Sequence, residues 1–118
     1  MDYSEFNQLA DEFGFAVCYP QGTLDGYDNT FFNVGYDFQN NETVDDVAYL
    51  QNLSAYFQSI NSIDATKVFC TGMSNGGELS YLLACQASDI FCSVAPVSGT
   101  MMSWFYDACE PLEPISVF

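Results

Sequence analysis

Apolar residues recur along the chain at helical spacing in two places. Over residues 6–13 they follow one another every three or four positions, and Gly14 then ends the pattern. A longer stripe follows the T-V-D-D stretch that begins at Thr43 and resembles a capping box. Asp45 and Asp46 fall in its first turn, where they complement the helix dipole or form a paired-carboxylate site. The apolar members of this second predicted helix are Val44, Val47, Leu50, Leu53, Phe57 and Ile60.

Short apolar runs rich in β-forming residues alternate with these helices. They are "FAVCYP" (15–20), "KVFCTG" (67–72), "FCSVAPVSG" (91–99) and "PISVF" (114–118). A further helix is predicted over 75–87, and loops over 21–41 and 100–112. This alternation predicts an α/β domain over residues 1–118, with a mostly parallel sheet and helices on both of its faces.

The charge of the chain narrows the classes of partner. Sixteen Asp and Glu residues stand against one basic residue, Lys67, which gives a formal net charge of −15. Such a surface repels phosphate backbones and anionic lipids, so we expect neither nucleic acid nor a membrane as a partner. No apolar run approaches the roughly 18 residues of a membrane span. Hydrophobic residues make up 49% of the chain, which excludes an intrinsically disordered protein.

A glycine–serine–glycine pattern stands where a predicted strand meets a predicted helix. Gly72, Ser74 and Gly76 form G-x-S-x-G, the spacing of a nucleophile elbow, a sharp turn that exposes a serine hydroxyl. We expect a strained backbone at Ser74. We also expect that Gly72 and Gly76 must be glycines, because side chains at these positions would collide with the neighbouring strand and helix. The turn would aim the N–H of Asn75 at a developing oxyanion. A glycine-rich structural turn with an idle serine is the competing interpretation.

The chain resembles the polyhydroxybutyrate depolymerase and feruloyl esterase-like family of α/β-hydrolases. The resemblance is carried by "ADEFGFAVCYPQG", "FFNVGY", "VDDVAYLQNL", "IDATKVFCTGMSNGGELSYLLAC" and "FCSVAPVSGT". It implies a three-layer α/β-hydrolase fold, with Ser74 as the nucleophile and the N–H of Asn75 as one oxyanion donor. It also implies a second donor from a loop that would precede Met1, and a triad acid and histidine that would follow Phe118.

The chain contains no histidine, although a catalytic serine needs a base. We interpret this absence as truncation, because the matches fall in one contiguous middle part of the family. A divergent pseudoenzyme is the competing account. The resemblance also places 15–20 and 67–72 as strands with a third strand between them in the fold. We therefore expect either a gap of two strand spacings, roughly 9.6 Å, or direct non-native pairing of these two strands.

Aromatic residues are concentrated in the predicted 21–41 loop. These rings either line a groove for a hydrophobic polyester or a phenolic acyl group, or cover the edge of the core. The resemblance places an aromatic residue and an asparagine near the site here. It therefore favours Phe31, Phe32 and Asn33 as substrate-binding residues.

Five cysteines leave an odd number for pairing. Cys18, Cys70 and Cys92 fall inside apolar runs, where a thiol behaves as a small buried hydrophobe. Cys85 ends the helix after the serine and Cys109 lies in the loop before the last strand, so these two are the candidate disulfide. A bridge there would fit an oxidising compartment, and five free thiols are the alternative.

These observations predict a serine carboxylic-ester hydrolase that works through an acyl-enzyme, present here as an incomplete catalytic domain. No metal or organic cofactor is implied, and the partner is a polyester or a phenolic or carbohydrate ester. The opening MDYSEFNQLADEF has neither a basic nor an apolar leader region. We expect an extracellular or periplasmic location, with any signal peptide upstream of Met1. A non-catalytic polyester- or carbohydrate-binding relative and a serine peptidase on the same fold stay open.

Overall fold

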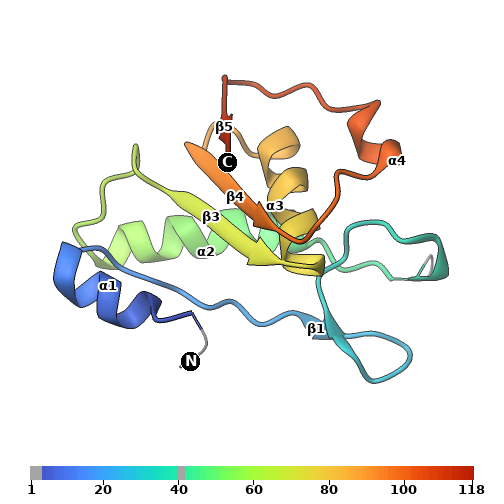
Figure 1. The fold of residues 1–118 in the computed structure, drawn as a ribbon, viewed down its shortest axis with the longest axis horizontal. Coiled ribbons are helices and arrows are strands. Elements are labelled where there is room, and N and C mark those ends of the chain that lie inside the picture. Colours follow the sequence, from blue (N-terminus) through green and yellow to red (C-terminus); the bar gives the residue numbers. More distant parts are fainter. Residues whose placement is uncertain (1–3, 40–41) are drawn as a thin grey trace.

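A small parallel sheet lies at the centre of the fold. The computed structural model describes residues 4–39 and 42–118. The three strands are β3 (Phe69–Met73), β4 (Ser93–Val97) and β5 (Ser116–Val117), in the order β3-β4-β5. All neighbours are parallel, and β3 pairs with β4 along its whole length. Helices flank this sheet (Figure 1), which confirms the predicted α/β class and is consistent with part of an α/β-hydrolase fold.

Helix α3 (Asn75–Gln86) packs against β3 and β4, and α2 (Asp46–Ile60) packs beside α3. Side chains of β3 alternate between the two faces, so Cys70 and Gly72 are half-buried whereas Phe69 and Met73 are exposed. Phe69 is 64% exposed and Met73 is 54% exposed. The sequence predicts helices over both faces, but among the described residues these apolar side chains of the second face remain open to solvent.

Helix α1 (Phe6–Phe13) confirms the first predicted helix. Gly14 ends it in the left-handed conformation, with φ of 72°, and its N–H donates to the carbonyl oxygen of Ala10. None of the residues in α1 is buried, and Phe13 is 67% exposed. The apolar stripe of this helix therefore follows helical spacing without reaching the core.

Helix α2 begins two residues later than the capping-box interpretation predicts. Asp45, rather than Thr43, is its N-cap, and the Asp45 carboxylate accepts a 2.9 Å hydrogen bond from the N–H of Ala48. Asp46 is buried and accepts a 2.6 Å hydrogen bond from the N–H of Asn33. The predicted start at Thr43 is wrong because Asp45, two residues later in the chain, binds the free backbone N–H of Ala48 in the first turn. Asp45 thus caps the helix and Asp46 binds a loop, so each carboxylate is engaged by a different backbone N–H group, which argues against a paired-carboxylate site.

Residues 15–20 form no strand, which corrects the prediction made for them. They run between α1 and the loop that carries β1 (Figure 1), and among the described strands β3 pairs only with β4. A run of β-forming residues becomes a strand only where a neighbour takes up its backbone hydrogen bonds. Direct pairing of 15–20 with β3 is therefore wrong, and the two-strand gap stays a prediction.

The two predicted loops contain short regular elements. The first holds an antiparallel hairpin and a 3-10 helix, which are β1 (Thr23–Leu24), β2 (Thr30–Phe31) and η1 (Asp37–Gln39). The second holds α4 (Ser103–Tyr106). Elements of two to four residues carry too little periodicity to be read from a sequence.

The core lies among α2, α3 and the segments that carry Val34 and Phe105. Its buried members are Val34, Val47, Leu50, Leu79, Leu82, Leu83, Cys85, Ala87, Phe91 and Phe105. No helix in the described ranges combines the length and the hydropathy that crossing a membrane requires.

A disulfide joins Cys85 of α3 to Cys109, with Cα atoms 4.9 Å apart. This is the pair that the sequence singles out. The other three cysteines are unbonded, as expected, and Cys70 and Cys92 are half-buried. The predicted burial is wrong for Cys18, which is exposed because residues 15–20 do not join the sheet.

Candidate active site

Ser74 lies at the sharp turn between β3 and α3. Its backbone has φ of 55° and ψ of −119°, a strained conformation that residues other than glycine rarely adopt. The N–H of Ser74 donates to the carbonyl oxygen of Val97 at 2.9 Å, and its own carbonyl accepts from the N–H of Glu78 at 3.0 Å. Ser74 is exposed. The structure thus places a strained, exposed serine at the carboxyl end of its strand, where the motif predicts it.

Close packing of β3 against α3 explains one of the two motif glycines. A Cβ on Gly72 would overlap the backbone carbonyl of Gly76. A Cβ on Gly76 would meet nothing within 4 Å, so the predicted collision there is wrong. The second close approach falls one residue later, where a Cβ on Gly77 would lie 2.9 Å from the carbonyl oxygen of Val97. Helix α3 therefore approaches the sheet through Gly77.

Asn75 is the first residue of α3, and its side chain binds the backbone of Phe32. Its Oδ1 accepts a 2.7 Å hydrogen bond from the N–H of Phe32, and its Nδ2 donates to the Phe32 carbonyl at 2.9 Å. Nδ2 also donates to the hydroxyl of Tyr36 at 3.2 Å. The backbone N–H of Asn75 stands at the helix N-terminus, where negative charge is favoured. The side chain therefore holds a remote loop against the elbow.

Tyr36 and Glu78 extend this network. The hydroxyl of Tyr36 donates to the carboxylate of Glu78, which lies in the first turn of α3. Burial, together with the neighbouring Glu78 carboxylate, raises the pKa of Tyr36 above its ordinary value, so the hydroxyl keeps its proton. The Tyr36 ring also stacks on Phe38, with centroids 4.9 Å apart. Sequence reasoning counted Tyr36 only among the aromatic residues of the loop and missed Glu78, because residues 42 positions apart are brought together only by folding.

The three residues predicted to bind substrate occupy different environments. Phe31 is buried, with 7% of its surface exposed, and Phe32 is partly buried against the core. The side chain of Asn33 is engaged by backbone groups, since Nδ2 donates to Val44 and Oδ1 accepts from Gly35. Phe32 is the member of this trio that is bound directly to a residue of the elbow.

Groups that could activate Ser74 are scarce in this chain. The sequence contains no histidine, and the carboxylate of Glu78 is bound to a tyrosine. Asp89 and Asp107 are exposed and follow helices rather than strands. In the part of the chain that the structure describes, no group of three histidine, cysteine or carboxylate residues could hold a metal ion.

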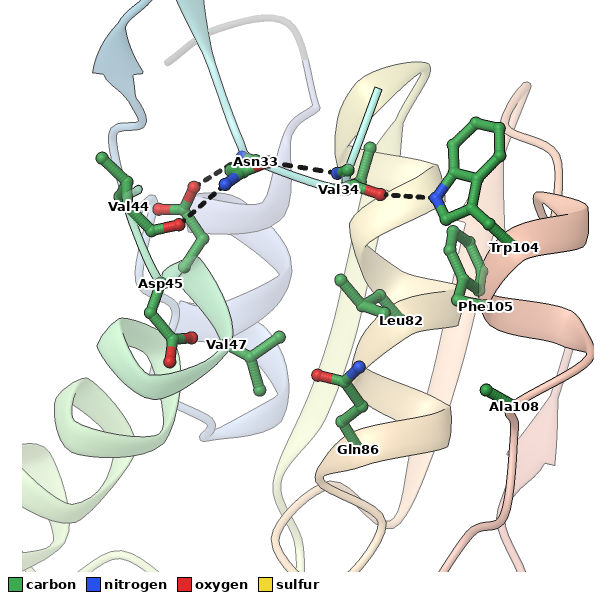
Figure 2. Close-up of a pocket in the computed structure, with 12 residues that line it drawn as sticks. Asn33, Val34, Val44, Asp45, Val47, Leu82, Gln86, Trp104, Phe105 and Ala108 are labelled. Carbon is green, nitrogen blue, oxygen red and sulfur yellow. Dashed lines mark hydrogen bonds between the residues drawn. The ribbon is translucent and has the colours of Figure 1, made fainter. Parts of the chain in front are cut away.

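A separate cavity of about 390 Å³ lies between α2, α3 and α4 (Figure 2). Trp104 and Phe105 line one side of it, and Val47 lines the other. The indole Nε1 of Trp104 donates to the carbonyl oxygen of Val34 at 2.9 Å, which fixes this wall to the segment after β2. Ser74 does not line the cavity, so the cavity and the elbow are distinct features.

Residues 2–115 match a family profile described as Esterase PHB depolymerase. The chain belongs to this family. The matched stretch contains the complete G-x-S-x-G turn and the strands β3 and β4, and it ends one residue before β5. Membership therefore rests on nearly the whole chain and confirms the family resemblance.

Curated relatives of this esterase family carry names that refer to ester hydrolysis. Feruloyl esterase D of Neurospora crassa is 37% identical over 80 residues, which cover 68% of this chain and 27% of the relative. Probable acetylxylan esterase A of Neosartorya fischeri is 27% identical over 111 residues, which cover 93% of this chain and 29% of the relative. Poly(3-hydroxybutyrate) depolymerase of Ralstonia pickettii is 29% identical over 99 residues, which cover 80% of this chain and 20% of the relative.

The chain spans less than a third of the length of each of these relatives. No solved structure gives a significant match to it.

Proposed function

We propose that this chain carries the nucleophile of a serine carboxylic-ester hydrolase. The observation that carries the proposal is the strained elbow at Ser74, in a chain that belongs to an esterase family. In the proposed reaction, Ser74 Oγ attacks the ester carbonyl and loses its proton to a base. The alcohol then leaves with a proton, and water releases the acid from the acyl-enzyme.

The backbone N–H of Asn75 is the proposed donor to the oxyanion. It lies at the first position of α3, where N–H groups have no partner within the helix and carry partial positive charge. Both N–H bonds of the Asn75 side chain are already directed at Phe32 and Tyr36. The backbone group is therefore the donor that Asn75 can offer to substrate, and one such donor contributes about 3 kcal/mol to transition-state stabilisation.

Activation of Ser74 requires a base that these 118 residues do not supply, since they lack histidine. We propose that the histidine, the triad acid and the second oxyanion donor come from polypeptide outside them. Coverage of less than a third of each relative supports this proposal.

The proposed substrates are carboxylic esters of the kinds that the relatives' names describe, which are acetylxylan, feruloyl esters and poly(3-hydroxybutyrate). Phe32 is the side chain that we place nearest the acyl group, because Asn75 holds its backbone beside the elbow. The Cys85–Cys109 disulfide supports an extracellular or periplasmic location, where such bonds persist.

A non-catalytic binding protein is the second candidate function. The observation that favours it is the absence of histidine from a chain whose nucleophile turn is otherwise complete. A protein of this kind would bind the ester without cleaving it. The two candidates make opposite predictions for a chain extended by the missing parts.

The experiment compares the 118-residue chain with a version extended at both ends by the corresponding segments of its own gene. Both are assayed on a short-chain nitrophenyl ester and on the matching nitroanilide. We expect the extended enzyme to hydrolyse the ester and to lose this activity in Ser74→Ala. We expect turnover by the short chain to be lower by on the order of a millionfold, since it lacks the base.

Four outcomes would contradict the proposal. Rapid turnover by the 118-residue chain would show that its base has been misidentified. Full activity of the extended Ser74→Ala variant would exclude Ser74 as the nucleophile. Binding of the ester by the extended chain without hydrolysis would support the non-catalytic candidate, and faster cleavage of the anilide would indicate a peptidase.

A further inference from the structure

The side chain of Asn75 is committed to the protein rather than to a ligand. An amide offers two N–H donors and one carbonyl oxygen. The two donors go to the Phe32 carbonyl at 2.9 Å and to the Tyr36 hydroxyl at 3.2 Å. The oxygen accepts from the Phe32 N–H at 2.7 Å. Asn75, which directly follows Ser74, thus binds both backbone groups of Phe32, 43 positions earlier in the chain.

Phe32 and Tyr36 together set which way the Asn75 amide points. The Tyr36 hydroxyl has one proton, which it donates to Glu78, so its oxygen faces Asn75 as an acceptor. An amide turned by 180° would set its oxygen against the hydroxyl oxygen and its N–H₂ against the N–H of Phe32. The bond to a carboxylate is also about twice as strong as a bond between neutral groups. Glu78 therefore orients Tyr36, and Tyr36 reinforces the orientation that the Phe32 backbone gives Asn75.

Glu78 is itself attached to the nucleophile turn. Its N–H donates to the carbonyl oxygen of Ser74 at 3.0 Å, in the first turn of α3. The contacts consequently form a closed circuit, from Ser74 through Glu78 and Tyr36 to Asn75, which follows Ser74 in the chain. Side-chain bonds thus link Tyr36 to two residues of the first turn of α3, and a backbone bond links that turn to Ser74.

We propose that Tyr36 and Glu78 are positioning residues that act through Asn75. With Asn75 they form a clamp that fixes residues 31–36 as a wall beside Ser74 and keeps the Asn75 N–H aimed at the oxyanion. This inference rests on the proposed hydrolase function and deepens it, because the clamp would set both the oxyanion geometry and the space for the acyl group. The clamp itself can be tested without catalysis.

The first test measures hydrogen exchange of the Phe32 amide in the 118-residue chain by NMR. This amide donates to Asn75, so its protection reports on the clamp. We expect Asn75→Ala to raise its exchange rate about tenfold, and Tyr36→Phe or Glu78→Ala to raise it several-fold. Glu78→Gln should change it least, since an amide oxygen still accepts from the Tyr36 hydroxyl.

Two controls separate the clamp from general destabilisation. Tyr106→Phe removes the hydroxyl of a tyrosine that is 64% exposed at the end of α4, and it should leave Phe32 exchange unchanged. Amides in the middle of α3 should stay protected in every variant. Unchanged Phe32 exchange in both Tyr36→Phe and Glu78→Ala would overturn the proposal.

The second test uses the extended enzyme, with active serines counted by titration with an organophosphonate. Tyr36→Phe keeps the aromatic ring in the wall and removes only the hydroxyl that binds Asn75 and Glu78. It should therefore lower kcat per titrated serine about tenfold, through the oxyanion geometry, and leave KM within twofold. Glu78→Gln should recover most of the kcat that Glu78→Ala loses. A kcat per titrated serine that is unaffected in Tyr36→Phe would overturn the positioning role.

The two tests fail separately. An extended enzyme without Ser74-dependent activity would sink the hydrolase proposal and, with it, the catalytic part of this inference. Altered Phe32 exchange would still establish the clamp as a feature of the fold.

Discussion

At the scale of single residues, the elbow depends on glycines that the motif identifies only in part. Gly72 and Gly77 lie where backbone meets backbone, whereas Gly76 faces open space. The reason is geometric: β3 ends against the first turn of α3, and that turn rests on the end of β4. Gly77, outside the G-x-S-x-G letters, is therefore constrained as well, although less tightly than Gly72.

The residue-scale prediction compares three alanine substitutions in the 118-residue chain. Gly72→Ala and Gly77→Ala should each destabilise the fold by about 1–3 kcal/mol, because the new methyl group overlaps backbone atoms. Gly76→Ala should be neutral or stabilising by up to about 1 kcal/mol, because alanine favours a helix. Urea unfolding midpoints measure all three. Equal losses at Gly76 and Gly72 would show that the packing described for this turn is incorrect.

At the scale of elements, helix α2 shows how a cap sets a boundary. Asp45 binds the N–H of Ala48, and Asp46 turns inward to bind the N–H of Asn33. One aspartate therefore starts the helix and the next joins it to the segment that carries Phe32. The boundary of α2 and the position of the 31–36 wall are consequently linked.

The element-scale prediction uses Thr43 as a matched control for Asp45. Asp45→Ala should lower the free energy of unfolding by about 1 kcal/mol, the usual loss when an N-cap is removed. Thr43→Ala, at an exposed position outside the helix, should change it by less than about 0.5 kcal/mol. Urea titrations followed by circular dichroism would measure both. A larger loss at Thr43 than at Asp45 would restore the capping-box register.

At the scale of the whole molecule, the Cys85–Cys109 disulfide is the covalent tie across the core. It joins α3 to Cys109, which lies just after α4. Helix α4 itself carries Trp104 and Phe105, which line the cavity. Charge contributes little to cohesion, because the chain has a net charge of −15 and its single lysine forms an exposed ion pair with Asp64.

The molecule-scale prediction concerns this bond. Replacing both cysteines by serine should lower the free energy of unfolding by about 3.5 kcal/mol, from the entropy of closing a loop whose ends lie 24 positions apart. Reduction of the wild-type chain should give a similar loss. Cys18→Ser, at an exposed unbonded cysteine, should leave the unfolding midpoint unchanged. No shift on reduction would mean that the bond is dispensable to the fold.

The sequence by itself determined the features that depend on neighbours in the chain. Helical spacing and Gly14 define α1, the apolar runs before and after α3 define β3 and β4, and G-x-S-x-G defines the turn at Ser74. Local context also singled out Cys85 and Cys109 as the candidate disulfide, with five free thiols as the alternative, and the structure decided for the bond. Periodicity, caps and turns act over a few residues, so they can be read without knowing the fold.

Only the tertiary structure decided the features that depend on which remote segments meet. Residues 15–20 have strand composition and no paired neighbour, so they remain outside the sheet. Phe31 and Phe32 are adjacent and chemically alike, yet one is buried and the other is tied to Asn75. The clamp joins Tyr36 to residues about forty positions away. Backbone pairing and side-chain burial are set by contacts across the fold, and a linear pattern carries no record of those contacts.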